Sequence, residues 1–452
     1  MDPRRGKLDG WALYLVIAVC LVPVLAPPGP GRTAIVDPVN ALALAVFAGL
    51  RLTTRRPVWV PFIGPVLFMS LGSVLATFNA ANPRAAILTL VQDAYLYVCF
   101  VMLANLLRDR GDFRGLRLAW VLTASAVAII GIVQVVTHGN ASLLDVIKPK
   151  GFRAVGTFDQ PDELADYLVM SIFMVLSLNE EFGRMVRWSA IAIMSVGIVA
   201  SKANGGILAL MGGLLAWALV RAWTKRTSYT GLVGGALFAL SAGLVAVWLI
   251  AGVGVGSGQI KQLQANSILG RMSHSSEGRV EIWGSLWRRY SSNPLGIGPG
   301  NSRWQVLTIE ERQRSTVAPT QTFDSGADPF LSKEAHNDYV SYLIERGPLA
   351  LLFMLVLKFQ VFGRITRWWK TRAGTRPGWV RGGPLAAAAF GAWVASLINA
   401  NTIETLHFRH VWLFLAMVCA LGSMASEEHR ADSGEPAREI PALAGARAVA
   451  VT

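Results

Sequence analysis

Cysteine and histidine are both scarce in this chain. The three cysteines, Cys20, Cys99 and Cys419, each lie inside an apolar run, so the polar segments offer neither a disulfide partner nor a thiolate pair for a metal. The six histidines have no spacing typical of a metal site. We therefore expect a protein without disulfides, without a bound metal and without a cofactor.

Charged residues are also few, at 15% of the chain, whereas 53% of the residues are apolar and the mean hydropathy is +0.44. This composition excludes an ordinary soluble protein and indicates a polytopic membrane protein. The net charge of +14 would suit nucleic acid, but the basic residues gather in alternate loops between the apolar runs. Membrane topology produces that distribution, so we expect no nucleic-acid partner.

The apolar runs predict an all-α fold with about 12 transmembrane helices, because unpaired backbone groups are not tolerated in hydrocarbon. No sustained internal repeat is visible, which disfavours a transporter built from inverted repeats. The predicted spans are 11–26, 38–50, 58–78, 85–107, 118–137, 162–178, 188–201, 205–220, 231–253, 338–362, 384–400 and 411–425.

Lysine and arginine are concentrated in the short loops that share a side with both termini, and by the positive-inside rule this side is cytoplasmic. The helices within 1–253 then lead to a long polar loop, 254–337, on the outer side, which is periplasmic in a Gram-negative cell. The remaining transmembrane helices lie within 338–425. The tail, 426–452, is rich in Ala, Glu and Arg without a hydrophobic period, and we expect it to be disordered.

Ionisable residues inside the predicted spans are few. The main ones are Asp93, Asp166 and Lys358, with Glu345 and Arg346 near a break. Charges inside a membrane are candidates for function. For Asp93, a polar group bonded to a neighbouring helix is an equally good interpretation.

Among the basic residues on the predicted outer side, where short loops are usually poor in Lys and Arg, three are candidates for the site. They are Arg153, Lys202 and Arg279. Cations at the outer face suit a diphosphate headgroup, since arginine donates bidentate, charge-assisted hydrogen bonds to phosphate oxygens. The alternative is that each of them binds anionic lipid or is simply solvated.

We predict a helix over residues 277–290 of the long loop. Arg279, Trp283 and Trp287 follow one another at intervals of four residues and would lie on one face of it. An aromatic pair beside a cation suits an interfacial helix. Such a face would guide a lipid-linked substrate or stack on sugar rings; an amphipathic helix packed over the bundle is the alternative. The glycines of 296–300 would cradle phosphate, although a turn after Asn293-Pro294 fits them better.

His336 is the strongest single candidate, because it stands where the long loop meets an apolar span. A neutral imidazole there would take a proton from an acceptor hydroxyl, since its pKa lies near the working pH. A cap or a packing residue at the start of a helix is the alternative role for such a histidine.

Four short blocks follow one another on the predicted outer side. They are Arg153-x-x-Gly156-Thr157-Phe158; Ser201-Lys202-x-Asn204-Gly205; Gly278-Arg279-x-x-x-Trp283 followed by Asn293-Pro294-Leu295-Gly296-x-Gly298; and His336-Asn337-x-Tyr339 with Glu345-x-Gly347. In this order and placement, over about 153–347, the chain resembles the O-antigen ligase and O-antigen polymerase superfamily.

The resemblance implies a metal-independent inverting glycosyltransferase with a GT-C-like membrane fold in the bacterial inner membrane. The donor would be glycan on an undecaprenyl-diphosphate carrier at the periplasmic face, and the acceptor either lipid A-core or another carrier-linked glycan. Carried over by motif, Arg279 would bind the diphosphate leaving group and His336 would orient or deprotonate the acceptor.

The remaining residues of the four blocks would contact the diphosphate or the glycan. They are Arg153, Lys202, Asn204, Asn337, Tyr339 and Trp283. The family often has arginine where this chain has Asn204, so the second cation is open, and Lys202 is the favoured substitute. A transporter or flippase for lipid-linked oligosaccharide is the alternative function, and a non-catalytic scaffold for polysaccharide assembly is a third.

Overall fold

The computed structural model describes residues 10–25, 33–110, 114–137, 153–178, 183–225, 283–302 except residue 285, 335–372 and 382–433. Most of these residues are helical. The elements are α1 (Gly10–Leu21), α2 (Val36–Thr54), α3 (Ile63–Thr77), α4 (Pro83–Arg110), α5 (Arg114–Val136), α6 (Pro161–Ser177), α7 (Arg184–Ser201), α8 (Asn204–Lys225), α13 (Asp338–Arg372), α14 (Gly382–Asn399), the 3-10 turn η4 (Thr405–His407) and α15 (Arg409–Ser433). Each predicted span coincides with a helix except 231–253, which lies outside the described residues.

Within the described ranges, six helices are long and apolar enough to cross a membrane, judged by length and composition. The chain is therefore a polytopic membrane protein. The six are Val36–Thr54, Pro83–Asp109, Gly115–Val136, Arg184–Ser201, Asn204–Ala222 and Asp338–Arg367. Shorter apolar helices accompany them at Gly10–Leu21, Ile63–Thr77, Leu385–Asn399 and Arg409–Ser423.

The last helix, α15, is longer than the apolar pattern predicts. It continues to Ser433, into the tail 426–452 whose composition predicts disorder. Glu427, Glu428 and Arg430 are good helix formers, and adding residues to an existing helix avoids the cost of nucleation. The residues after Ser433 lie outside the described part of the chain.

The helix α6 is the buried centre of the bundle. Every residue of α6 except Asp162 and Glu163 is buried, and the helix packs against α5, α7, α8 and α14. Its one buried acid, Asp166, accepts a hydrogen bond from Asn399 of α14 and lies 2.8 Å from Nε2 of His410 in α15. Asp166 thus has partners from two other helices, as a charge buried in a bundle requires.

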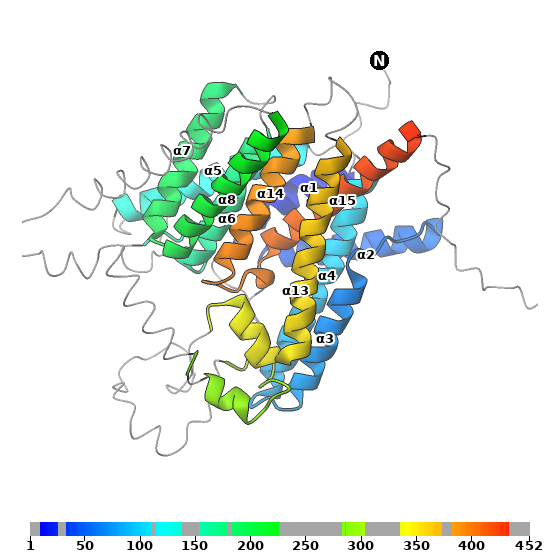
Figure 1. Cartoon of the computed structure of the whole chain (residues 1–452), viewed down its shortest axis with the longest axis vertical. Helices are drawn as coiled ribbons and strands as arrows, with labels where there is room; N and C mark the ends of the chain where they lie inside the picture. Colours follow the sequence, from blue (N-terminus) through cyan, green and yellow to red (C-terminus); the bar gives the residue numbers. More distant parts are fainter. Residues whose placement is uncertain are drawn as a thin grey trace, which may run out of the picture.

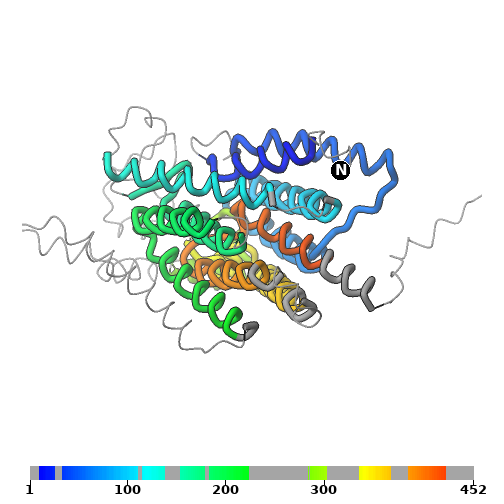
Figure 2. The backbone as a smooth tube through the Cα atoms, turned by 90° about the horizontal axis from the view of Figure 1, so that it is seen from above, coloured from blue at the N-terminus to red at the C-terminus, as the bar shows by residue number. Residues whose placement is uncertain are grey.

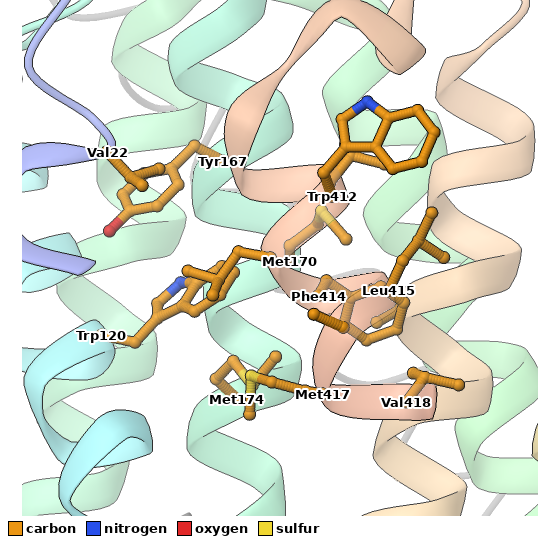
Figure 3. Close-up of a cluster of buried hydrophobic side chains, with 14 of the residues drawn as sticks. Val22, Trp120, Tyr167, Met170, Met174, Trp412, Phe414, Leu415, Met417 and Val418 are labelled. Atoms are coloured by element: carbon orange, nitrogen blue, oxygen red, sulfur yellow. The ribbon is translucent and has the colours of Figure 1, made fainter. Parts of the chain in front are cut away.

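A cluster of large side chains joins α6 to its neighbours. Figure 3 shows Tyr167 and other α6 side chains facing Trp120 of α5 and the side chains of 412–418 in α15. The indole N–H of Trp120 donates to Ser171 Oγ at 2.8 Å, so this large side chain is buried with its donor satisfied. Close packing of such side chains holds the helices in one arrangement.

The helices α8 and α14 approach until their backbones touch. A Cβ atom built on Gly213 would lie 2.7 Å from the carbonyl oxygen of Gly391, and one built on Gly391 would lie 2.9 Å from the carbonyl oxygen of Gly213. Small residues at crossings are typical of membrane helices, which associate through van der Waals contact. In Figure 2, α8 (green) and α14 (orange) lie on the side of the molecule opposite α1 and α2 (blue).

The helix α13 consists of two arms joined at Gly347 (φ 80°, ψ 175°), which Pro348 follows. Those dihedrals belong to a region reserved almost entirely for glycine. The arms are arranged so that Asp338, at the start of the first arm, lies 3.0 Å from Lys358 Nζ in the second. In Figure 1 the first arm (pale yellow) lies beside 283–302 (light green) at the lower end of the bundle.

Three arginine-bearing segments of the predicted cytoplasmic side meet at one end of the bundle. The guanidinium carbons of Arg108 in α4 and Arg364 in α13 lie 5.4 Å and 5.2 Å from the ring centroid of Trp59. Arg51 of α2 pairs with Asp109 of α4 at 2.6 Å. The structure therefore groups these arginines as the charge pattern predicts. Close to the opposite end of α4, the amide of Asn82 donates to Asn301 Oδ1 of the segment 293–302 at 2.7 Å.

Candidate functional site

The loop between α14 and α15 connects the starts of α8 and α13. On one flank, Asn337 Nδ2 donates to the carbonyl oxygen of Asn401 at 3.1 Å. On the other flank, Thr402 packs so closely against Gly205 that a Cβ atom there would collide with the threonine side chain. Two of the predicted blocks, far apart in the sequence, are thus neighbours through this loop.

Arg153 ties the segment before α6 to the end of α7. Its Nε donates to the carbonyl oxygen of Ser201 at 2.8 Å and its Nη2 donates to Asp162 Oδ1 at 3.0 Å. The amide of Ala154 adds a backbone hydrogen bond to Ala200. The Nε–Nη2 edge of Arg153, the edge best suited to a bidentate ligand, is therefore occupied by acceptors of the protein itself.

In the second block, Ser201 to Gly205, Lys202 is exposed and Asn204 is half-buried. Lys202 ends α7 with φ 53° and ψ 32°, the left-handed conformation common at helix C-termini, and is exposed. Asn204 begins α8 and is half-buried. Arg279, the cation predicted to bind the diphosphate, lies outside the described residues.

His336 has a positive φ of 49° and is partly exposed. Histidine adopts positive φ more readily than most residues, but the conformation still costs about 1 kcal/mol. Unlike Lys202, His336 does not end a helix; it precedes one. Backbone strain persists where its surroundings impose it, and it clusters at functional sites.

The residues on both sides of His336 hold it in place. Before it, Ala335 is buried and its carbonyl oxygen accepts the indole N–H of Trp283 at 2.8 Å. After it, Asn337 Oδ1 accepts the amide N–H groups of Tyr339 and Val340 at 2.8 Å and 3.0 Å. Asn337 is therefore the N-cap of α13, and its side-chain oxygen and nitrogen are both engaged with the protein.

Asp338 anchors the first arm of α13. Its carboxylate is bonded to Lys358 Nζ at 3.0 Å, to the amide of Thr405 at 2.9 Å and to the hydroxyl of Thr405 at 2.6 Å. Lys358 also lies 4.4 Å from the ring centroid of Tyr339, whose hydroxyl donates to the carbonyl oxygen of Leu397. The carboxylate of this buried ion pair thus accepts three hydrogen bonds, and such bonds help to offset the cost of burying the charges.

The segment 293–302 forms a turn, the preferred of the two interpretations of its glycines. The amide of Gly296 donates to Asn293 O at 2.8 Å. Glu345 closes the turn, since its carboxylate accepts the amides of Gly300 at 2.8 Å and Ser302 at 3.1 Å. These N–H groups point at Glu345, so the turn does not present them to a phosphate.

Trp283 and the residues 286–291 are helical, in agreement with the predicted helix over 277–290 in its described part. The two tryptophans differ in environment. Trp283 is partly buried and hydrogen-bonded to Ala335, whereas Trp287 is 54% exposed. Trp287 is therefore the more exposed of the two indole side chains.

A charged cluster lies where α4, α13 and η4 meet. Arg346 Nη1 donates to Asp93 and, at 3.2 Å, to Ser73 Oγ, so Asp93 is bonded to a neighbouring helix. His407 lies 3.6 Å from Asp93 and 3.4 Å from Glu404.

The carboxylates control the protonation of His407. Burial alone would lower the pKa of His407, but its interactions with Asp93 and Glu404 outweigh burial and raise it to about 10. Burial raises the pKa of Glu404, but the hydrogen bond to His407 and the charges of His407, His336 and Arg346 outweigh burial and lower it. His407 is therefore a cation at neutral pH, and Glu404 lies within electrostatic reach of His336.

Sequence reasoning passed over Arg346, Glu404 and His407 as members of this site. Arg346 was visible as a charge beside the Gly347-Pro348 break, and His407 as a polar residue in a short loop before an apolar span. Neither signal identifies a partner. Among the described residues, no group of three or more His, Cys, Asp and Glu side chains is arranged to hold a metal ion.

Comparison with known family models gives a match over part of the chain. Residues 189–355 match the family model described as O-antigen ligase. The matched range includes every predicted site residue except Arg153. No curated protein sequence matches the chain.

Proposed function

Because the chain belongs to the O-antigen ligase family of membrane enzymes of polysaccharide assembly, we propose that it is a metal-independent inverting glycosyltransferase. The donor is glycan linked to undecaprenyl diphosphate, and the acceptor is lipid A-core or a second carrier-linked glycan. The observation that carries this proposal is the gathering of two predicted blocks around the loop 400–408, with His336 in a strained conformation beside it.

In the proposed reaction, the hydroxyl oxygen of the acceptor attacks the anomeric carbon of the donor glycan. The imidazole of His336 takes the proton from that hydroxyl. The new bond forms on the face opposite the carrier, so the configuration inverts. The bond from the anomeric carbon to the phosphate oxygen breaks, and its electrons leave with the diphosphate. A positioned base contributes about 10²- to 10⁴-fold in rate.

Arg279 stabilises the charge that develops on the diphosphate. A fixed guanidinium does this without a metal, and removing such a group costs about 3–4 kcal/mol in comparable sites. Lys202 and Asn204 lie just before Gly205, which packs against Thr402 of the loop 400–408, and they supply further contacts to the phosphate or glycan. Arg153 supports them, since it holds the end of α7.

The remaining predicted contacts line the approach to His336. Tyr339 and Asn337 hold the start of α13, so their contribution to glycan binding acts largely through position. Trp283 supports the segment before His336, and its exposed neighbour Trp287 is the better surface for a sugar ring.

We further propose a GT-C-like arrangement of about 12 transmembrane helices in the bacterial inner membrane. Both termini are cytoplasmic by the positive-inside rule. Helices within 1–253 and 338–425 frame the periplasmic loop 254–337, and the site faces the periplasm. The grouping of Arg51, Arg108 and Arg364 at one end of the bundle supports this orientation.

A reconstituted reaction tests the proposal. Purified protein is mixed with carrier-linked oligosaccharide, with and without lipid A-core. Chains that lengthen on the carrier identify a polymerase, and glycan on the core identifies a ligase. Absence of both products, together with movement of the carrier-linked substrate across sealed liposomes, would instead favour a flippase.

A further inference from the structure

The guanidinium of Arg346 has one occupied edge and one bare edge. The side chain is 3% exposed, and its Nη1 donates to Asp93 and Ser73. Its Nε and Nη2 are also buried, yet within the described residues neither has a hydrogen-bond partner. A buried donor without a partner costs about 1–3 kcal/mol, and more when the group is charged.

The bare edge is the one that recognises oxyanions. Nε and Nη2 of arginine donate two parallel hydrogen bonds, a geometry that matches the two oxygens of a carboxylate or phosphate. The Tyr342 ring, with its centroid 4.7 Å from the guanidinium carbon, covers one side of the group. Arg346 is thus held by Asp93, Ser73 and the Tyr342 ring, with its bidentate edge left without a partner among the described residues.

Another arginine of the same protein shows how the fold fills such a fork. The side chain of Arg409 is 11% exposed, and its Nε and Nη2 donate to both carboxylate oxygens of Asp37. In Arg409, therefore, the protein supplies the carboxylate. In Arg346, by contrast, Nη1 donates to the carboxylate of Asp93, and the bidentate edge formed by Nε and Nη2 has no acceptor among the described residues.

The surroundings of Arg346 provide an approach and a second polar contact. Asp93, Glu404 and His407 are 18–24% exposed in their side chains, so the cluster borders the surface of the bundle, while Nε and Nη2 of Arg346 lie beneath that surface. Glu404 Oε1 is buried and, in the described part of the chain, accepts no hydrogen bond. An acceptor without a partner, within electrostatic range of two such donors, suits a ligand that carries both an oxyanion and a hydroxyl group.

We propose that Arg346 is an oxyanion-binding residue of the glycan-transfer site, with its Nε and Nη2 groups gripping a phosphate or carboxylate of a substrate and Glu404 accepting a neighbouring hydroxyl. That the ligand is a substrate rests on the function proposed above. Binding of the oxyanion itself does not depend on turnover. The phosphate would come from the carrier diphosphate, and the carboxylate from an acidic sugar.

Binding measurements on the purified full-length protein separate these sources. The probes are inorganic pyrophosphate and glucuronate, titrated by calorimetry into wild type, Arg346→Lys and Arg409→Lys. Lysine keeps the charge but loses the planar fork, so we expect Arg346→Lys to weaken one probe about tenfold or more. Arg409→Lys, whose fork faces Asp37, is the matched control and should change binding less than twofold.

Weakened pyrophosphate binding assigns the phosphate source, and weakened glucuronate binding assigns the acidic sugar. Equal affinities in wild type and Arg346→Lys for both probes would overturn the proposal, as would equal losses in both variants. If Arg346→Lys does not fold, Glu404→Gln serves instead. Removing this negative charge should tighten anion binding at Arg346, and unchanged affinity would overturn the proposal. Failure of glycan transfer with intact probe binding would count against the proposed function alone.

Discussion

The two ends of α4 treat their charges differently. Near Arg108, each of three arginines has a contact that accommodates its charge. Arg108 and Arg364 lie over the ring of Trp59, and Arg51 pairs with Asp109. In the half of α4 that begins at Pro83, around Asp93, the charges contributed by the first arm of α13 are not fully paired. There the fold leaves the bidentate edge of Arg346 and one oxygen of Glu404 without a partner among the described residues.

This difference separates architecture from function. Where charge serves only topology, rings and exposed carboxylates are enough to hold it. Where charge is buried and left incomplete, the fold forgoes stability that a small rearrangement would recover. The other buried side-chain atoms without a hydrogen-bond partner in the described residues include the neutral donors of Tyr167, Trp217 and Trp393, which cost less to leave unpaired than a charged one.

The largest expected effect on stability comes from the ion pair that anchors the site. Asp338→Asn leaves Lys358 as a buried charge without a counterion, which costs about 3–5 kcal/mol. Asp109→Asn removes the partner of Arg51 at the opposite end, where the carboxylate is 47% exposed, and should cost less than about 1 kcal/mol. Melting temperatures of the two purified variants in the same detergent compare the ends directly. Equal decreases in melting temperature would mean that the two ion pairs contribute equally to stability, which would contradict the difference between the two ends.

A smaller effect is expected from the protonation of His407. Because its pKa is raised to about 10 from a usual value of 6.5, the protonated histidine stabilises the folded state fully below about pH 6.5. That contribution, about 2 kcal/mol after allowance for partial exposure, is lost as the pH rises through about 10. Thermal melts at pH 6 and pH 10.5 should therefore diverge more for wild type than for His407→Gln. An identical change in melting temperature between the two pH values in both proteins would contradict a stabilising charge on His407.

The smallest change in stability is expected at His336 itself. Glycine adopts positive φ without strain, so His336→Gly removes the imidazole and relieves about 1 kcal/mol of backbone strain, partly offset by the greater entropy of glycine in the unfolded chain. The variant should melt within a few degrees of wild type. A large drop would assign His336 a packing role, the alternative that its position at a helix start leaves open.

Much of the fold could be predicted from the sequence, because apolar runs report directly on membrane helices. The spans, the turn at 293–296 and the grouping of the arginine-bearing ends followed from local pattern alone. A break was visible in the sequence beside Glu345 and Arg346, but the arrangement of the two arms of α13 was not. That arrangement depends on Asp338 meeting Lys358 across the break and on Gly347 lying against the turn.

The candidate site was predictable in its location but only partly in its membership. His336 was identifiable from its place at the junction of loop and span. Arg346 was not, because its meaning depends on Asp93, 253 residues away in the chain, and on which edge that carboxylate occupies. Asn337 illustrates the converse: its motif indicates substrate binding, whereas its side chain caps α13 and bonds Asn401.

The central claim is that the end of the bundle around His336 transfers glycan with this imidazole as the base. The most direct test is the initial rate of transfer from carrier-linked oligosaccharide by purified wild type and His336→Gly, at equal concentrations of folded protein. The account predicts a rate at least about 100-fold lower in the variant, with an unchanged melting temperature. A rate within about threefold of wild type, below any contribution expected of a positioned base, would contradict it.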